Sequence, residues 1–255
     1  MITPLLQTTL TYATIPVVFT IVGATAGVYL PAMRKLRSHV LHLAAGVVFA
    51  VVAVNLLPEI QRRALVTDVV LGFVMGIVTM LVIDKILDRL RDDVPPTVVG
   101  AEKALTKQSG KIEFSLLAAV AIDFLLDGLL LGVGFAAGAK IGILLALAEA
   151  AEQLSVGLAI AGELTNGGVE RSRVILIVSG LGSLVFVTAL LGATVLSGLT
   201  GGAMEVVLSF GLAALLYLVT QELLREAFEE KETATSTVMF FLGFLVFLVI
   251  GMTLE

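Results

Sequence analysis

Cysteine is absent from this chain of 255 residues, histidine occurs twice, and charged residues make up only 15% of the sequence. Without cysteine there can be no disulfides, thiolate metal sites or thiol redox chemistry. The scarcity of charge is matched by 58% hydrophobic residues and a mean hydropathy of +1.06. Soluble domains are roughly 45–50% apolar and about 25% charged. The excess of apolar surface predicts an integral membrane protein.

Signals for several other classes of protein are also missing. The first residues, MITPLLQTTL, carry no positive charge before the first apolar run, so we expect no cleaved signal peptide. No nucleophile–base set and no phosphate-binding loop appears, so we do not expect an enzyme. The lipid bilayer is the expected partner, and we expect no nucleic acid.

Apolar runs long enough to cross a bilayer, which takes about 20 residues, recur along the chain. We predict an all-α, polytopic membrane protein that forms a single transmembrane domain over residues 1–255. The charged segment 88–114, which contains Pro95 and Pro96, is predicted to be a solvated loop. The eight expected spans are residues 8–30, 40–60, 66–87, 115–137, 142–163, 174–197, 203–225 and 235–254.

The basic residues are distributed unevenly between the two sets of connecting segments. If both termini lie outside, 13 of the 16 lysines and arginines face the cytoplasm, as the positive-inside rule requires. We therefore predict a multi-pass protein of the cell membrane with both termini outside and a cytoplasmic loop at 88–114. The outer side keeps Arg62, Arg63 and Lys140.

A weak internal repeat links the second and seventh spans, which run in opposite directions. The second span ends in NLLPEI (Asn55–Ile60) and the seventh in ELLREA (Glu222–Ala227). Matching segments of opposite direction are typical of the inverted repeats of transporters, and we predict a 3+2+3 arrangement. A chance match between leucine-rich segments is the alternative.

Four acids interrupt the fourth and fifth spans. In AIDFLLDGLLLG, Asp123 and Asp127 are four residues apart, and in LAEAAEQLSVG, Glu149 and Glu152 are three apart, so each pair shares a helical face. A turn near residues 139–140 would place Asp127 level with Glu152, about 18 Å from the turn. We expect all four carboxylates to converge between the two helices.

These carboxylates need compensation, because one acid at the centre of a bilayer costs roughly 2.5–3.5 kcal/mol. No lysine or arginine lies near them within the two spans. A bound cation is one solution and protonation is the other. Oxygen ligands suit Mg²⁺, Ca²⁺, Mn²⁺ or Fe²⁺, whereas zinc usually takes some histidine or cysteine. A hydrated cavity that binds no metal is the alternative.

The same residues carry a resemblance to the ZIP (Zrt/Irt-like) family of metal transporters. HLAAGVVFAVVAVNLLPEI is similar to the second span of that family, and DGLLLGVGFAAG to part of its fourth. The family motifs His-Asn-x-Pro-Glu-Gly and His-(Asp/Glu/Asn)-x-Pro-Glu-Gly match DFLLDG and AEAAEQ. Asp123 stands at the first histidine, and Asp127, Glu149 and Glu152 stand at acidic positions. The resemblance implies these four residues as the metal site.

This chain departs from both motifs, since their histidines and prolines are missing and Gln153 replaces the second glycine. We predict import of a divalent cation, with Mn²⁺, Fe²⁺, Zn²⁺ or Mg²⁺ as the transported substrate. Two alternatives stay open. The chain could have lost transport and serve as a regulatory or partner subunit, or it could carry another solute with the acids as a proton relay. The sequence also leaves a homodimer open.

Other polar residues in or beside the spans have weaker interpretations. His39 and His42 are either a release-side ligand pair or ordinary interfacial histidines, and we favour the second. Asn55 and the pair Gln221–Glu222 either line a pathway or bond across helices. Solvated helix ends are the favoured interpretation for Glu163, Asp84 and Asp88.

Overall fold

The computed structural model describes residues 4–30, 34–63, 65–91, 114–196, 198–228 and 233–253. Within these ranges the chain is helical and contains no strand. The all-α, eight-span prediction is confirmed, and every predicted boundary agrees with the structure to within four residues. The eight helical segments long and apolar enough to cross a membrane are Pro4–Tyr29, Ser38–Arg62, Val66–Ile86, Leu117–Ala137, Ala139–Asn166, Arg171–Leu196, Gly202–Leu223 and Ala234–Thr253.

Several spans are built from more than one helical element. The first joins two helices, and the second and seventh each contain a π-helical turn. The elements are α1 (Pro4–Tyr12), α2 (Thr14–Tyr29), α3 (Arg34–Ala50), η1 (Val51–Leu56), α4 (Leu57–Arg63), α5 (Val66–Arg91), α7 (Phe114–Ala137), α8 (Ala139–Asn166), α9 (Arg171–Leu196), α10 (Gly202–Tyr217), η3 (Leu218–Leu223), α11 (Leu224–Ala227) and α12 (Ala234–Thr253).

Four spans form the interior of the bundle and four lie at its periphery. In the spans built on α3, α7, α8 and α10, between 50% and 67% of the most apolar stretch is buried. The corresponding share is 17–28% in the spans built on α1–α2, α5, α9 and α12. The exposed surface of the peripheral spans is apolar, as lipid contact requires.

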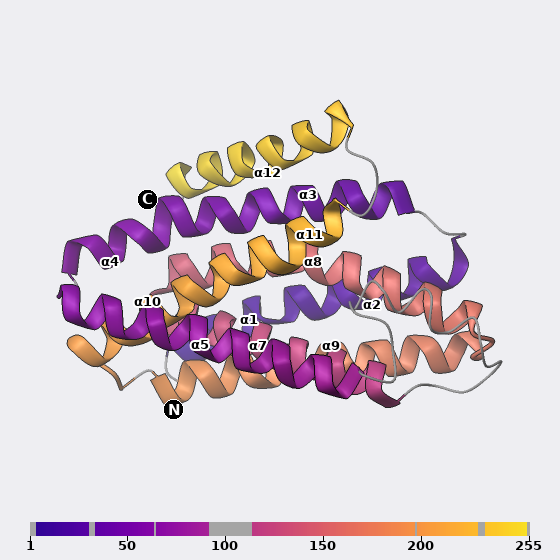
Figure 1. Cartoon of the computed structure of the whole chain (residues 1–255), viewed down its shortest axis with the longest axis horizontal. Helices are drawn as coiled ribbons and strands as arrows, with labels where there is room; N and C mark the ends of the chain where they lie inside the picture. The colour runs from indigo at the N-terminus through magenta and orange to yellow at the C-terminus, as the bar shows by residue number, and fades with distance from the viewer. Residues whose placement is uncertain are drawn as a thin grey trace.

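Each peripheral span packs chiefly on one interior span. α2 packs on α8, α9 on α7, α5 on α10, and α12 on α3, and these four pairs make the most extensive contacts of the molecule. The interior helices close a ring, in which α7 contacts α8 and α10, and α3 contacts α8 and η3. Figure 1 shows α12 lying along α3 at the upper edge of the bundle.

Glycines allow each of the four pairs to approach closely. A Cβ atom added at Gly23 would collide with the carbonyl of Leu154, and one at Gly128 with the carbonyl of Val185. Gly72 meets α10 and Gly46 meets α12 in the same way. Packing of this kind drives helix association where lipid removes the hydrophobic driving force.

Two departures from ideal helices and predicted ends have local causes. The first span is interrupted at Ala13, because Pro16 has no N–H to donate to the carbonyl four residues earlier. The segment predicted as a loop from residue 88 remains helical to Arg91, since a charged helix can continue past the membrane into water. Residues 92–113 of that predicted loop lie outside the described residues.

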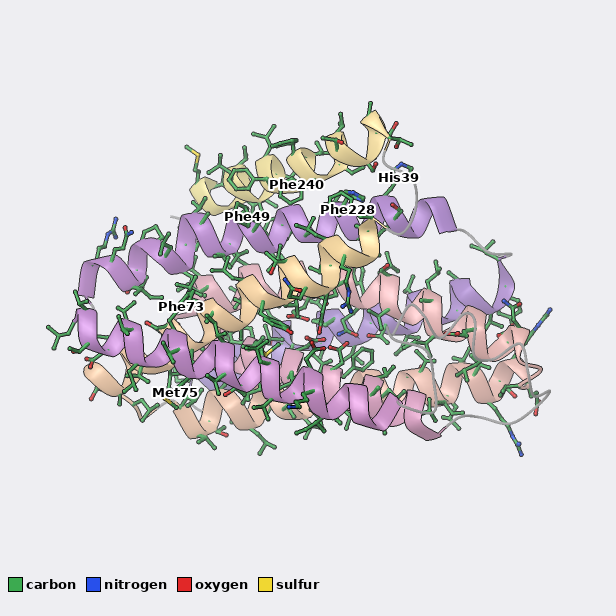
Figure 2. The ribbon with its side chains drawn as sticks, in the orientation of Figure 1. His39, Phe49, Phe73, Met75, Phe228 and Phe240 are labelled. Carbon is green, nitrogen blue, oxygen red and sulfur yellow. The ribbon has the colours of Figure 1, made fainter. Side chains whose placement is uncertain are left out.

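Aromatic side chains also pack across the contact between α3 and α12, beside Gly46. The ring centroids of Phe49 and Phe240 are 6.2 Å apart, and Phe49 lies 6.3 Å from Phe244. Figure 2 shows Phe49 and Phe240 between these two helices. Such tilted aromatic pairs stabilise a contact beyond the area they bury.

Candidate functional site

The carboxylates of the fourth and fifth spans lie where α7 and α8 meet inside the bundle. The connection between these helices is the single residue Gly138, rather than residues 139–140. Asp127 and Glu149 are therefore each eleven residues from the turn, which corresponds to about 16 Å along each helix. By this count Glu149 lies at the same distance from the turn as Asp127. Glu152, which we predicted to be level with Asp127, lies about one helical turn farther from Gly138.

Three of the four predicted site residues are removed from the surface of the protein. Asp127 is 1% exposed, Glu149 is 2% and Glu152 is 3%, whereas Asp123 is half-buried. The neighbouring Phe124 and Ala148 are completely buried, so the surroundings of the acids are apolar. A carboxylate in such surroundings stays ionised only with a partner ion or hydrogen bonds, and otherwise it takes up a proton.

A chain of hydrogen bonds ties Asp127 to the fifth and first spans. The Gln153 amide donates from Nε2 to Asp127 Oδ2 over 2.9 Å. The Thr20 hydroxyl donates to Gln153 Oε1 over 3.1 Å. The other oxygen of Asp127, Oδ1, and Glu149 Oε2 are buried and accept no hydrogen bond from any described residue. Two buried carboxylate oxygens are thus left with free lone pairs on adjacent helices.

Like charges surround Asp127. Glu149, Asp123, Glu152 and Glu222 all lie close enough to interact with its carboxylate electrostatically. Lys140, the only basic residue of α7 and α8, lies at the far end of α8 beside the turn. Four or five carboxylates in low dielectric cannot all stay ionised without a compensating cation. The arrangement is suited to capture either a cation or protons.

The carboxylates are near one another, yet they are not grouped as a finished ligand set. Over the residues that the structure describes, no three His, Asp or Glu side chains are close enough together to hold one metal ion. An ion that uses several of them therefore has to draw them together. The carboxylate side chains of α7 and α8 would move toward the ion.

Glu222 joins the site from the seventh span, which the sequence suggested only as one of two interpretations. It is the fifth residue of η3, and Asn55 is the fifth residue of η1 in the second span. Asn55 lies beside Gly251 of α12, whereas Glu222 interacts with Asp127. π-Helical turns are frequent at functional sites. The signal in the sequence was the acid itself, since nothing in composition marks a π turn.

His42 and Asp84 have contacts that the sequence did not indicate. His42 is 3% exposed, its Nδ1 lies 2.8 Å from the Ser38 carbonyl oxygen, and Nε2 has no partner among the described residues. His42 is therefore buried inside the protein, near the end of its span that begins at Ser38. Asp84 is half-buried and accepts a hydrogen bond of 2.9 Å from the Tyr217 hydroxyl, so it is not simply a solvated helix end. The side chain of Asp88 lies outside the described residues.

Comparison with known proteins gives no family assignment. No family model matches this chain, and no curated protein matches it.

Proposed function

We propose that this chain is a transporter of divalent cations with a ZIP-like fold, which imports metal through the carboxylates between α7 and α8. The ligands would come from Asp123, Asp127, Glu149 and Glu152. The observation that carries the proposal is the pair of buried oxygens without donors, Asp127 Oδ1 and Glu149 Oε2, inside a group of like charges. A divalent cation would supply the positive charge that compensates these carboxylates.

Transport through this site would proceed by alternating access, in which the halves of the protein rock around a fixed point at mid-membrane. A 3+2+3 inverted repeat, relating spans one to three to spans six to eight and span four to span five, would provide the two halves. Two observations support it. The exchange converts the pair α2–α8 into α9–α7 and the pair α5–α10 into α12–α3. It also superimposes η1 on η3.

The test is uptake of Mn²⁺ into proteoliposomes that contain the purified protein. Asp127→Ala and Glu152→Ala are each expected to reduce uptake at least tenfold, because each removes a ligand and one of the negative charges that attract the cation. Glu170→Gln is the control, since Glu170 is exposed between α8 and α9 and its carboxylate accepts a hydrogen bond from Ser172. Wild-type uptake by both alanine variants would remove the proposal.

A carrier of another solute, with the acids as a proton relay, is the second candidate. The separation of the carboxylates favours this candidate, because no three described His, Asp or Glu side chains are close enough together to hold one metal ion. Proton transfer needs only two neighbouring carboxylates at a time. A pH-sensitive dye inside the proteoliposomes distinguishes the two candidates. Proton movement that depends on Asp127 and occurs without any divalent ion would favour the relay.

A further inference from the structure

Gln153 is an unusual residue to find at the centre of a membrane bundle. Its side chain is completely buried, and it links three spans through hydrogen bonds to Asp127 on α7 and Thr20 on α2. A buried amide in apolar surroundings is costly unless both of its ends are satisfied. Here both ends are satisfied, and one of them is satisfied by a residue of the proposed cation site.

The network fixes which way the amide points. When Asp127 is ionised, as it is when it binds a cation, its carboxylate can only accept hydrogen bonds, so the amide nitrogen has to face it. The amide oxygen then faces Thr20, whose single hydroxyl proton is shared between this oxygen at 3.1 Å and the Pro16 carbonyl oxygen at 2.9 Å. Thr20 is itself held in a tight place, because Gly157 of α8 and Gly182 of α9 leave no room for a Cβ atom beside it. The orientation of Gln153 is therefore set from the peripheral span.

In this orientation the two oxygens of Asp127 have different environments. Oδ2 is occupied by the Gln153 amide at 2.9 Å, whereas Oδ1 is buried with no donor from any described residue. A cation that approaches Asp127 finds both lone pairs of Oδ1 available, whereas the Gln153 bond already takes up one of the two on Oδ2. To use both oxygens, the ion would have to share Oδ2 with the Gln153 amide, so the hydrogen bond favours binding through Oδ1 alone.

We propose that Gln153 is a positioning residue that favours binding of a cation through one oxygen of Asp127 and thereby selects small divalent cations such as Mn²⁺ over Ca²⁺. Ca²⁺ takes six to eight oxygen ligands and readily uses both oxygens of a carboxylate, whereas smaller ions hold fewer, singly bound oxygens in octahedral geometry. The proposal rests on the proposed function, because it assigns a selectivity to that same site. Thr20 contributes indirectly, because its hydrogen bond orients the Gln153 amide.

The experiment measures binding of Mn²⁺ to the purified full-length protein by electron paramagnetic resonance, with Ca²⁺ as competitor. Gln153→Met keeps the length of the side chain and removes the donor. We expect it to raise the affinity for Ca²⁺ relative to Mn²⁺ on the order of tenfold, the usual scale for loss of a second-shell bond. Thr20→Val should change the ratio in the same direction by a smaller factor, because Gln153 remains but can rotate.

Thr25→Val is the control on the same helix, since the exposed Thr25 hydroxyl donates to the Ile21 carbonyl and to no other described residue. It should leave the ratio unchanged. If Gln153→Met does not fold, as judged by gel filtration and thermal stability, Thr20→Val alone decides the question. If Gln153 had a purely structural role, Gln153→Met would lower the affinities for Mn²⁺ and Ca²⁺ by the same factor.

The outcomes separate this inference from the proposed function. Wild-type protein that binds Mn²⁺, with an unchanged ratio in both variants, overturns the role of Gln153 and leaves the cation site intact. Wild-type protein that binds no divalent ion overturns both. A shifted ratio in Gln153→Met and Thr20→Val, with Thr25→Val unchanged, supports both.

Discussion

The carboxylate of Asp127 is subject to two opposing demands. Burial and the neighbouring acids make its charge costly, while the Gln153 amide stabilises that charge through one hydrogen bond. One neutral donor is weak compensation for a group surrounded by carboxylates. At the scale of single residues, the site therefore trades stability of the empty protein for the capacity to take up positive charge.

This trade leads to a prediction about stability. Asp127→Asn is expected to raise the melting temperature of the protein in metal-free detergent by a few degrees, because it removes a buried charge from among like charges. Mn²⁺ should raise the melting temperature of the wild type and leave that of Asp127→Asn unchanged. Differential scanning fluorimetry measures both. A variant that melts below the wild type without metal, yet is still stabilised by Mn²⁺, would contradict the account.

Residues near each other in sequence were predictable from spacing, and residues joined across spans were not. The separations of Asp123 from Asp127 and of Glu149 from Glu152 follow from helical periodicity. The hydrogen bond between Thr20 and Gln153 and the electrostatic interaction of Glu222 with Asp127 depend on how distant spans pair. A single sequence does not specify that pairing, so these residues entered the site only with the structure.

At the scale of elements, close backbone approach at glycine holds the peripheral spans to the interior. Gly23 brings α2 against α8, and Gly128 brings α7 against α9. These two pairs flank the acids, so their spacing determines where Asp127 and Gln153 lie. Apolar run length predicted all eight spans, because a bilayer fixes that length. It could not predict η1 or η3, because the length of an apolar run does not distinguish a π-helical turn from an α-helix.

Alanine at these glycines tests the packing. Gly23→Ala and Gly128→Ala would each push the Cβ into a backbone carbonyl on the neighbouring helix, and overpacking of this kind costs roughly 1–3 kcal/mol. We expect the melting temperature to fall by about 3–10 °C. Gly180→Ala is the matched control, since a Cβ there meets no atom within 4 Å. Its melting temperature should stay level or rise, because alanine favours the helix. Equal effects at all three positions would rule out the packing role.

At the scale of the whole molecule, an even number of spans places both ends on one side of the membrane. α1 begins and α12 ends on the same side of the bundle (Figure 1). The charge distribution predicts that this side is outside, and this orientation remains a prediction. It decides the direction in which a cation would travel through the site.

The absence of native cysteine makes the orientation easy to test. Thr200→Cys lies in the exposed turn between α9 and α10, and Asn166→Cys lies at the exposed end of α8. In intact cells a membrane-impermeant maleimide should label Thr200→Cys alone. Asn166→Cys should react only after the membrane is opened. The reverse pattern would mean that the protein is inserted the other way, with both termini inside.

Anomalous diffraction from crystals soaked in Mn²⁺ tests the central claim most directly. The account predicts an anomalous peak between α7 and α8, close to Asp127 Oδ1 and Glu149 Oε2, with the Gln153 amide still bonded to Oδ2. The peak should vanish in Asp127→Asn crystals soaked in the same way. A wild-type map with no peak between these helices, at Mn²⁺ concentrations that saturate uptake, would contradict it.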